Sequence, residues 1–216
     1  MGKLLCPSMM CADYGNLRSE MERLQEAGAD IFHIDVMDGR YVPNFGMGLQ
    51  DIEFLTKNAT IPCDVHLMIM NPANYVKKFC DLGVKIMYVH PEADLHPART
   101  LQMIRDCGVK SGIAINPGTS FETVEPLLPL CDYLLVMTVN PGFAGQKYVP
   151  SVDKKIDQLL AAKEEYGYEI MIDGACSPAV IERLNAKGVL GFILGTSALF
   201  NKGRSYKEIM PELRNL

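Results

Sequence analysis

The sequence contains no apolar run that approaches the roughly 20 residues of a membrane-spanning helix. It also has no C-x-x-C pair, and its seven cysteines occupy unpatterned positions, which favours reduced thiols over a disulfide framework. The stretch Met1–Pro7 is too short for the apolar region of a secretory signal. We therefore expect a cytoplasmic protein that has no membrane partner.

The formal net charge is −5, so basic residues are not in excess. A net negative charge argues against a surface that binds nucleic acid. Linkers, composition breaks and low-complexity segments are also missing. Nearly half of the 216 residues are hydrophobic, at 48%, so the chain can form a large core. These features predict a single domain over residues 1–216.

Short apolar segments recur along the whole chain and predict eight β-strands. Such uninterrupted apolar runs are typical of parallel strands that are buried on both faces. The predicted strands are Leu4–Ser8, the stretch His33–Gly39, Cys63–Met68, Ile86–His90, Gly112–Asn116, Tyr133–Met137, Glu169–Asp173 and Gly191–Gly195.

Helical patterns separate these segments. Leu17, Met21 and Leu24 recur at helical spacing before a glycine, and a later helix is expected to bury Tyr75, Phe79 and Leu82. Strict alternation of strand and helix predicts an α/β protein with a parallel sheet. Eight such units favour a closed (β/α)8 barrel. A doubly wound open sheet is the alternative. It is less favoured, because polar residues appear at the ends of nearly every predicted strand and not only at one crossover point.

Polar residues gather where the predicted strands end, and in a barrel these ends meet at one face. His33 and Asp35 are two residues apart on a strand, so both point to the same side. One such histidine alone is equally well explained as a satisfied core residue. The complete set of polar residues at the strand ends is harder to explain in this way, because each unsatisfied buried polar group costs about 1–3 kcal/mol. The set comprises Ser8, His33, Asp35, His66, His90, Asn116, Thr138, Asp173 and Gly195.

Two histidines and two aspartates of this set can converge on one divalent cation: His33, Asp35, His66 and Asp173. Mixed nitrogen and oxygen ligands suit zinc, iron, manganese or cobalt and do not by themselves select one of these metals; we take zinc as the expected metal. The pattern gives no indication of an organic cofactor.

Glycine-rich loops follow the sixth, seventh and eighth predicted strands. They contain Asn140-Pro141-Gly142-Phe143-Ala144-Gly145-Gln146, Gly174 and Gly195-Thr196-Ser197. Glycine lets backbone N–H groups approach an anion closely, and barrels often bind phosphate near strands seven and eight. Any one loop is explained as an ordinary turn, whereas three neighbouring loops favour a phosphate site.

Together these parts suit the inversion of one carbon centre in a sugar phosphate. A cation that holds the sugar's oxygens would make the neighbouring carbon acidic. Asp35 and Asp173 could then remove a proton from one face and return one to the other. Met37, Met68 and Met137 lie at or near strand ends, where core packing is their default role; they could also form an apolar wall that excludes water.

Five motifs resemble the ribulose-phosphate 3-epimerase family over residues 8–200. They are H-I-D-V-M-D-G-R-Y-V-P-N (33–44), D-V-H-L-M (64–68), V-M-T-V-N-P-G-F-A-G-Q (136–146), I-D-G (172–174) and G-T-S-A-L-F (195–200). The resemblance implies a (β/α)8 barrel that epimerises ketose phosphates with a bound metal, through an enediolate, and that forms homo-oligomers.

Carried over by position, the resemblance implies metal ligands at His33, Asp35, His66 and Asp173, with the two aspartates as the acid–base pair. Ser8 and His66 are expected to contact the substrate. The phosphate is expected at Gly142–Gly145, Gly174-Ala175 and Gly195-Thr196.

Some motifs depart from the commonest pentulose-phosphate pattern, among them S-M-M-C-A-D (8–13) and D-G-A-C-S (173–177). They are similar to the D-allulose-6-phosphate 3-epimerase branch, so we expect that six-carbon substrate, with D-ribulose 5-phosphate as the alternative. A barrel lyase is less favoured, because its Asp-x-Lys strand end is replaced by His-Ile-Asp (33–35). A non-catalytic phosphosugar-binding barrel would lack an acid or a base, and both are present.

Overall fold

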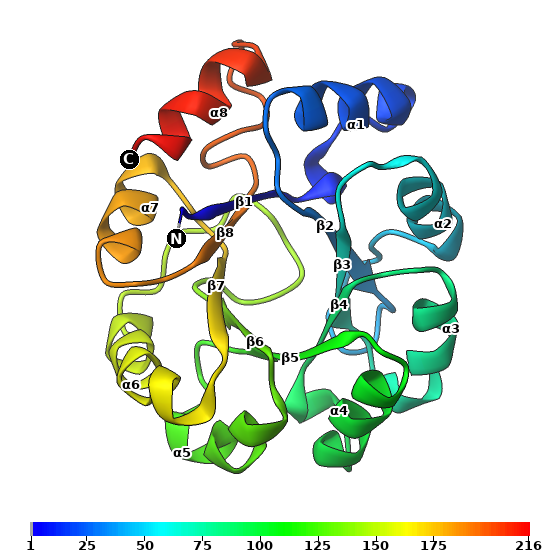
Figure 1. The fold of residues 1–216 in the computed structure, drawn as a ribbon, viewed down its shortest axis with the longest axis vertical. Helices are drawn as coiled ribbons and strands as arrows, with labels where there is room; N and C mark the ends of the chain where they lie inside the picture. Colours follow the sequence, from blue (N-terminus) through cyan, green and yellow to red (C-terminus); the bar gives the residue numbers. More distant parts are fainter. Residues whose placement is uncertain (1) are drawn as a thin grey trace.

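A computed structural model describes residues 2–216 of the protein. Eight parallel strands form a ring, and helices surround it on the outside (Figure 1). This arrangement is the predicted (β/α)8 barrel, so the open doubly wound sheet is excluded. The strands are β1 (Leu4–Pro7), β2 (Phe32–Met37), β3 (Cys63–Met68), β4 (Ile86–Val89), β5 (Lys110–Ile115), β6 (Tyr133–Met137), β7 (Glu169–Asp173) and β8 (Gly191–Leu194).

The ring closes between its first two strands. Each strand from β2 to β7 pairs with the strand that follows it in sequence, and β8 pairs in parallel with β1. A single bridge joins Ser8 to His33 across the remaining gap. Nearby, the backbone N–H of Leu5 donates to Oδ2 of Asp30 over 2.7 Å. The closure therefore depends on residues at the end of β1, next to the predicted site.

Eight helices form the outer layer of the described chain. They are α1 (Leu17–Glu26), α2 (Leu49–Asn58), α3 (Val76–Asp81), α4 (Pro97–Asp106), α5 (Phe121–Val124), α6 (Val152–Tyr166), α7 (Pro178–Asn185) and α8 (Tyr206–Arg214). One helical stripe was predicted wrongly. The helix α3 begins only at Val76, and it buries Val76 and Phe79. Tyr75 precedes the helix and is 45% exposed.

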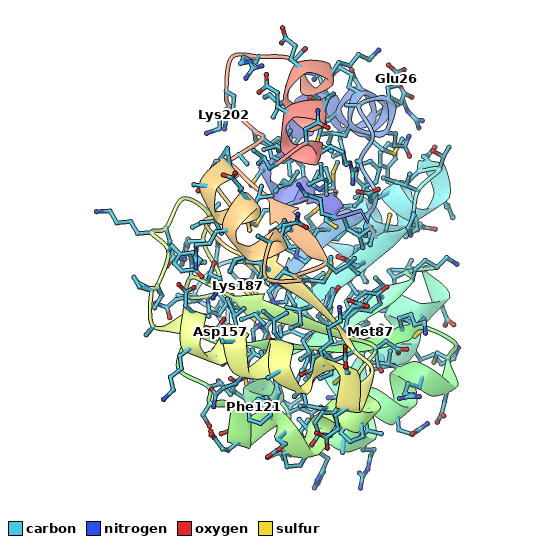
Figure 2. All side chains as sticks on the ribbon, turned by 60° about the vertical axis from the view of Figure 1, so that its left-hand side comes forward. Glu26, Met87, Phe121, Asp157, Lys187 and Lys202 are labelled. Carbon is cyan, nitrogen blue, oxygen red and sulfur yellow. The ribbon has the colours of Figure 1, made fainter. Side chains whose placement is uncertain are left out.

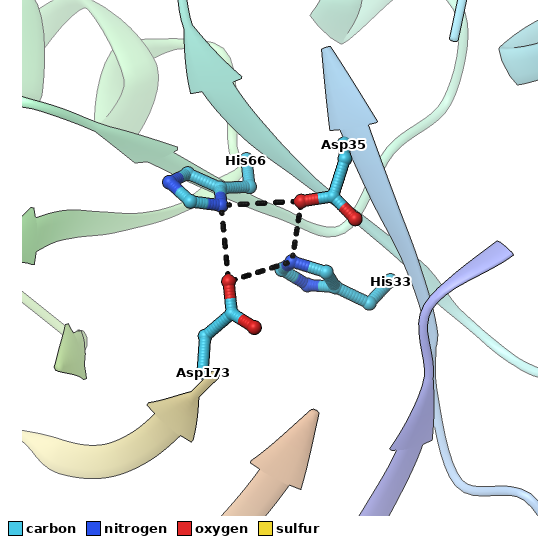
Figure 3. A group of neighbouring side chains, drawn as sticks. All are labelled: His33, Asp35, His66 and Asp173. Carbon is cyan, nitrogen blue, oxygen red and sulfur yellow. Dashed lines mark ion pairs between the residues drawn. The ribbon is translucent and has the colours of Figure 1, made fainter. Parts of the chain in front are cut away.

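Successive side chains of each strand point alternately to the outside and to the inside of the barrel, as strand geometry requires. Along β2, Phe32, Ile34 and Val36 point outward and pack with the surrounding helices in the larger core. Between them, His33 and Asp35 point into the barrel (Figure 3). Burial of apolar residues on the outer face thus fixes which residues line the interior.

Below the polar residues the barrel interior is apolar. Its core contains Tyr88, Leu135, Met171 and Ile193 and excludes water from the floor of the barrel. Gly112 faces the Tyr88 ring, and a Cβ atom at Gly112 would lie 2.6 Å from that ring and 2.9 Å from the carbonyl oxygen of Tyr133. The bulky tyrosine therefore requires the absence of a side chain on the neighbouring strand.

Charged side chains such as Glu26, Asp157, Lys187 and Lys202 lie on the outside of the barrel (Figure 2), whereas Glu20 of α1 and Lys155 of α6 are buried. Asp157 of α6 accepts a 2.6 Å hydrogen bond from Lys187, which follows α7. The seven cysteines are all free thiols. In the part of the chain described, we find no helix with the length and hydropathy to cross a membrane.

The predicted strand positions are close to the observed ones, with one functional difference. The strand β2 runs two residues past Asp35, and His33 is only its second residue. These side chains therefore lie inside the barrel and not at the strand end, where the sequence pattern had placed them.

We expect Gly112→Ala to destabilise the fold by about 1–3 kcal/mol, because the added methyl group overlaps the Tyr88 ring and a backbone oxygen. Urea unfolding would measure the loss. Gly118→Ala is the matched control, since a Cβ there meets nothing within 4 Å. Equal stability of the two variants would contradict this packing constraint.

Candidate metal centre and substrate cavity

Two histidines and two aspartates converge inside the barrel, and their candidate ligand atoms all lie within 4.8 Å of one another (Figure 3). Oδ1 of Asp35 lies 3.4 Å from Nε2 of His33 and 3.4 Å from Nδ1 of His66. Oδ2 of Asp173 lies 3.9 Å and 3.5 Å from the same two nitrogens. The convergence expected from the sequence is therefore present.

Strand register explains this convergence. The strands β2 and β3 pair so that His33 is beside Asp64 and Asp35 is beside His66. All four point to the barrel interior, because they alternate with outward apolar residues on both strands. Asp173, the last residue of β7, approaches the group from across the ring.

Each histidine offers a different ring nitrogen to the cluster. His33 presents Nε2, and its Nδ1 lies 2.6 Å from Oδ1 of Asp64. His66 presents Nδ1, and its Nε2 lies 2.8 Å from Nε2 of His90. Partners on the far nitrogen fix the orientation and tautomer of a metal-binding histidine.

The carboxylates and histidines shift each other's protonation. Burial alone would lower the pKa of His33, but the carboxylates of Asp64 and Asp35 raise it well above its ordinary value. Burial likewise opposes the charged form of His66, yet Asp173 and Asp35 raise its pKa. Burial would raise the pKa of Asp35, and the charge of His33 holds it below the usual range. The site favours a positive charge at its centre.

The four residues fit a bound divalent cation. Nε2 of His33 and Nδ1 of His66 are fully buried, and neither has a hydrogen-bond partner within residues 2–216. Such unpaired buried nitrogens are costly unless another group satisfies them. Two imidazole nitrogens and two carboxylate oxygens are donors that zinc, iron, manganese and cobalt accept. The arrangement could hold a divalent metal, and it does not identify which one.

Ser8 connects the cluster to the cavity above it. Its hydroxyl donates to Oδ2 of Asp35 over 2.7 Å, while Oδ1 of Asp35 faces the histidines. The two oxygens of this carboxylate therefore have different surroundings, and one is oriented from outside the cluster.

A pocket opens over the cluster; together with the open solvent at its mouth, its empty space is about 570 Å³. Most of the residues predicted from the sequence line it: Ser8, Asp35, Met37, Met68, Met137, Gly142, Phe143, Ala144, Gly145, Asp173, Gly174, Ala175, Gly195 and Thr196. His33 and His66 are fully buried and lie behind its wall.

The loop after β7 is shaped by unusual backbone angles. Gly174 has a φ of 102°, and a Cβ there would lie 2.5 Å from the Val139 side chain. Ala175 follows with a φ of 47°. Left-handed backbone costs an ordinary residue about 1–2 kcal/mol, so Ala175 adopts a conformation that glycine would adopt more readily.

Several residues of the site were not predicted. Cavity residues of this kind are Met10, Cys11, Val139, Cys176 and Ile193, whereas Asn140, Pro141, Gln146 and Ser197 belong to the predicted glycine-rich loops. Asp64 and His90, which contact the two histidines, were also not assigned roles. Asp64 could have been found, because it is two residues before His66 on a strand and must share its face.

We expect the affinity of the chain for Zn²⁺ to rise with pH above 6.5, the ordinary pKa of histidine. The raised pKa of His33 keeps a proton on this residue, and the proton must leave before a cation binds. Calorimetry in buffers of different ionisation enthalpy would count the protons released. His96→Gln, at an exposed histidine, is the control. Uptake without proton release would contradict the assignment.

Comparison with known proteins identifies relatives over nearly the whole chain. A model of the "Ribulose-phosphate 3 epimerase family" matches residues 4–200. A protein named ribulose-phosphate 3-epimerase from Synechocystis sp. is 39% identical over 98% of this chain and 93% of its own length. Proteins of the same name from Bacillus subtilis (40% identical, 82% of this chain and 85% of theirs) and Escherichia coli (36%, 98% and 95%) also match.

Solved structures with a similar fold have much lower identity. A 3-keto-L-gulonate-6-phosphate decarboxylase from Vibrio cholerae has a TM-score of 0.73 at 13% identity, covering 100% of this chain and 97% of that one. A tryptophan synthase α-subunit from Pyrococcus furiosus has a TM-score of 0.70 at 15% identity, covering 100% and 98%. These likenesses support the barrel fold alone. The family match and the curated relatives show that this chain belongs to the ribulose-phosphate 3-epimerase family.

Proposed function

We propose that the protein epimerises a ketose phosphate at C3, with D-ribulose 5-phosphate and D-xylulose 5-phosphate as the interconverted pair. The observation that carries the proposal is the convergence of two histidines and two aspartates at the base of a cavity that glycine-rich loops border. Family membership supports the same reaction class.

His33, Asp35, His66 and Asp173 would hold one divalent cation, and we propose zinc because two nitrogen and two oxygen donors suit it. When bound, the cation would stabilise negative charge that develops on the substrate oxygens. The remaining chemistry is proton transfer, and it needs no organic cofactor.

Asp35 and Asp173 would exchange protons with C3. They lie on strands from opposite parts of the ring, and both line the cavity. Each can face the cation with one carboxylate oxygen and C3 with the other. One aspartate removes the C3 proton to give a planar enediolate, and the other returns a proton to the opposite face. The configuration at C3 is thereby inverted.

Ser8 would keep Asp35 oriented through its 2.7 Å hydrogen bond. Met37, Met68 and Met137 are nearly completely buried and would form the apolar wall that limits water near the enediolate. Water exclusion matters because it strengthens the electrostatic contacts inside the cavity.

The phosphate would bind to the loops that follow β6, β7 and β8. These are Gly142–Gly145, Gly174-Ala175 and Gly195-Thr196, all of which line the same cavity as the aspartates. Positive φ at Gly142, Gly145 and Gly174 permits backbone conformations in which N–H groups can turn toward an anion.

The length of the substrate is the point at which the sequence motifs and the relatives differ. The motif variants favour allulose 6-phosphate, whereas the relatives are named for ribulose phosphate. The names therefore fit the five-carbon alternative better, and we take it as the proposed substrate. Allulose 6-phosphate is the second candidate, on the strength of the motifs at 8–13 and 173–177. Residues 1–216 would act as one domain; the cytoplasmic location and homo-oligomeric state remain predictions.

We expect Asp35→Asn and Asp173→Asn each to lower kcat by about 10²–10⁴-fold, because an amide oxygen can still face a cation but the proton carrier is lost. Exchange of the substrate's C3 hydrogen with solvent deuterium, followed by NMR, measures this loss. Circular dichroism verifies that the variants fold. Thr60→Ala, at an exposed position outside the cavity, is the control.

The reaction class would be wrong if the metal-loaded wild-type protein exchanged no C3 hydrogen with either ketose phosphate. Retention of full activity by both asparagine variants would reject the two-aspartate assignment in particular.

Substrate length is tested by kcat/KM for D-ribulose 5-phosphate and D-allulose 6-phosphate, measured side by side. We expect the five-carbon substrate to be preferred by about tenfold or more, since one additional carbon in a fitted pocket changes the barrier by about 1–3 kcal/mol. The reverse ratio would assign the six-carbon substrate instead.

A further inference from the structure

A fully buried histidine outside the metal cluster contacts one of its members. His90 follows β4, and its Nε2 lies 2.8 Å from Nε2 of His66. Both residues have no exposed surface, and their rings are 5.0 Å apart between centroids. No role in the proposed reaction has yet been given to His90, which does not line the cavity.

Tautomer logic determines the direction of this hydrogen bond. His66 faces Asp35 and Asp173 with Nδ1, and a cation held there would occupy this nitrogen, which leaves Nε2 to carry the ring proton. The facing nitrogens of His66 and His90 cannot both carry protons at 2.8 Å. His90 Nε2 is therefore the acceptor, and the proton of His90 is on Nδ1.

The rest of the His90 ring is held in place by its neighbours. Its Nδ1 has no hydrogen-bond partner within residues 2–216 and lies 3.7 Å from Oε2 of Glu92, a carboxylate that accepts a hydrogen bond from the hydroxyl of Thr119. The ring of Tyr41 covers His90 at 4.7 Å between centroids. Tyr41 is fixed by Asn116, whose side-chain N–H donates to the tyrosine oxygen over 2.6 Å. His90 thus has one available orientation for its accepting nitrogen.

The two histidines of the cluster consequently have unlike supports. His33 is backed by the carboxylate of Asp64 at 2.6 Å, and His66 is backed by the imidazole of His90. A carboxylate makes a histidine a more basic ligand, whereas a neutral imidazole orients it without adding charge to the buried interior.

We propose that His90 is a positioning residue that fixes the tautomer and ring orientation of His66 and thereby presents Nδ1 to the metal. The inference rests on the proposed function, because it requires a cation at the cluster. It adds a contribution from β4 to a site whose ligands come from β2, β3 and β7.

The test is the affinity of purified variants for Zn²⁺, measured by competition with a chromophoric chelator. His90→Leu removes the acceptor at similar volume, and we expect metal affinity to fall about 10–100-fold. His90→Gln supplies an amide oxygen as acceptor and should recover part of the loss. The matched control is His96→Leu, because His96 is exposed and its side chain makes no capping hydrogen bond to α4.

A second readout separates positioning from simple stability. The visible absorption of the Co²⁺-loaded protein reports ligand geometry, and we expect its bands to shift in His90→Leu and not in His96→Leu. Thermal unfolding of the metal-free proteins records any general loss of stability, which by itself would leave the Co²⁺ spectrum unchanged.

Equal zinc affinity and an unchanged Co²⁺ spectrum in His90→Leu would overturn the assignment. Should that variant not fold, His90→Gln is compared with His90→Asn, whose amide is too short to reach His66; equal affinities would again overturn it. Wild-type protein that takes up no divalent metal would overturn this inference together with the metal centre. Wild-type protein that binds metal but exchanges no C3 hydrogen would count against the proposed reaction alone.

Discussion

The parallel register between β2 and β3 is the constraint on which the site depends. It places His33 beside Asp64 and Asp35 beside His66, so that two histidines and two carboxylates share one patch of the barrel interior. Isolated buried charges are strongly disfavoured, but these groups lie within ion-pair distance of one another. A slip of β3 by one residue against β2 would turn Asp64 and His66 toward the helices and bring apolar side chains of β3 inside.

The barrel divides its tasks between the two halves of the chain. The candidate ligands come mainly from β2 and β3, whereas the glycine-rich loops follow β6, β7 and β8. The strand β7 belongs to both groups, because it ends at Asp173 and continues directly into Gly174-Ala175. Under the proposed function, this continuity would set the distance between C3 and the phosphate, which is the dimension that distinguishes substrates of different length.

Much of the fold and the centre of the site could be predicted from the sequence, since each follows from short-range periodicity. Short apolar runs that alternate along the chain with helical patterns predicted the barrel. The two-residue spacing of His33 and Asp35 placed both side chains on one face of a strand. Contacts between residues far apart in sequence were harder to predict. His90 could be placed near the others but not matched to His66, because a match requires ring orientations that no spacing reveals.

The exact limits of elements were also beyond the pattern. Tyr75 was expected in a buried stripe because it is three to four residues from other apolar positions, yet the helix begins after it. The left-handed backbone at Ala175 has no local signal either, since alanine does not favour it. The conformation of such residues depends on the whole loop around them, and a few neighbouring residues in the sequence do not predict the conformation of that loop.

The ribosome synthesises the four candidate ligands in a fixed order along the chain. His33, Asp35 and His66 emerge within the first third of synthesis, while Asp173 emerges near the end. Under the proposed function, turnover would require Asp173 and therefore β7 in the ring. A chain that ends before β7 would keep three of the four candidate ligands and lack the second proton carrier.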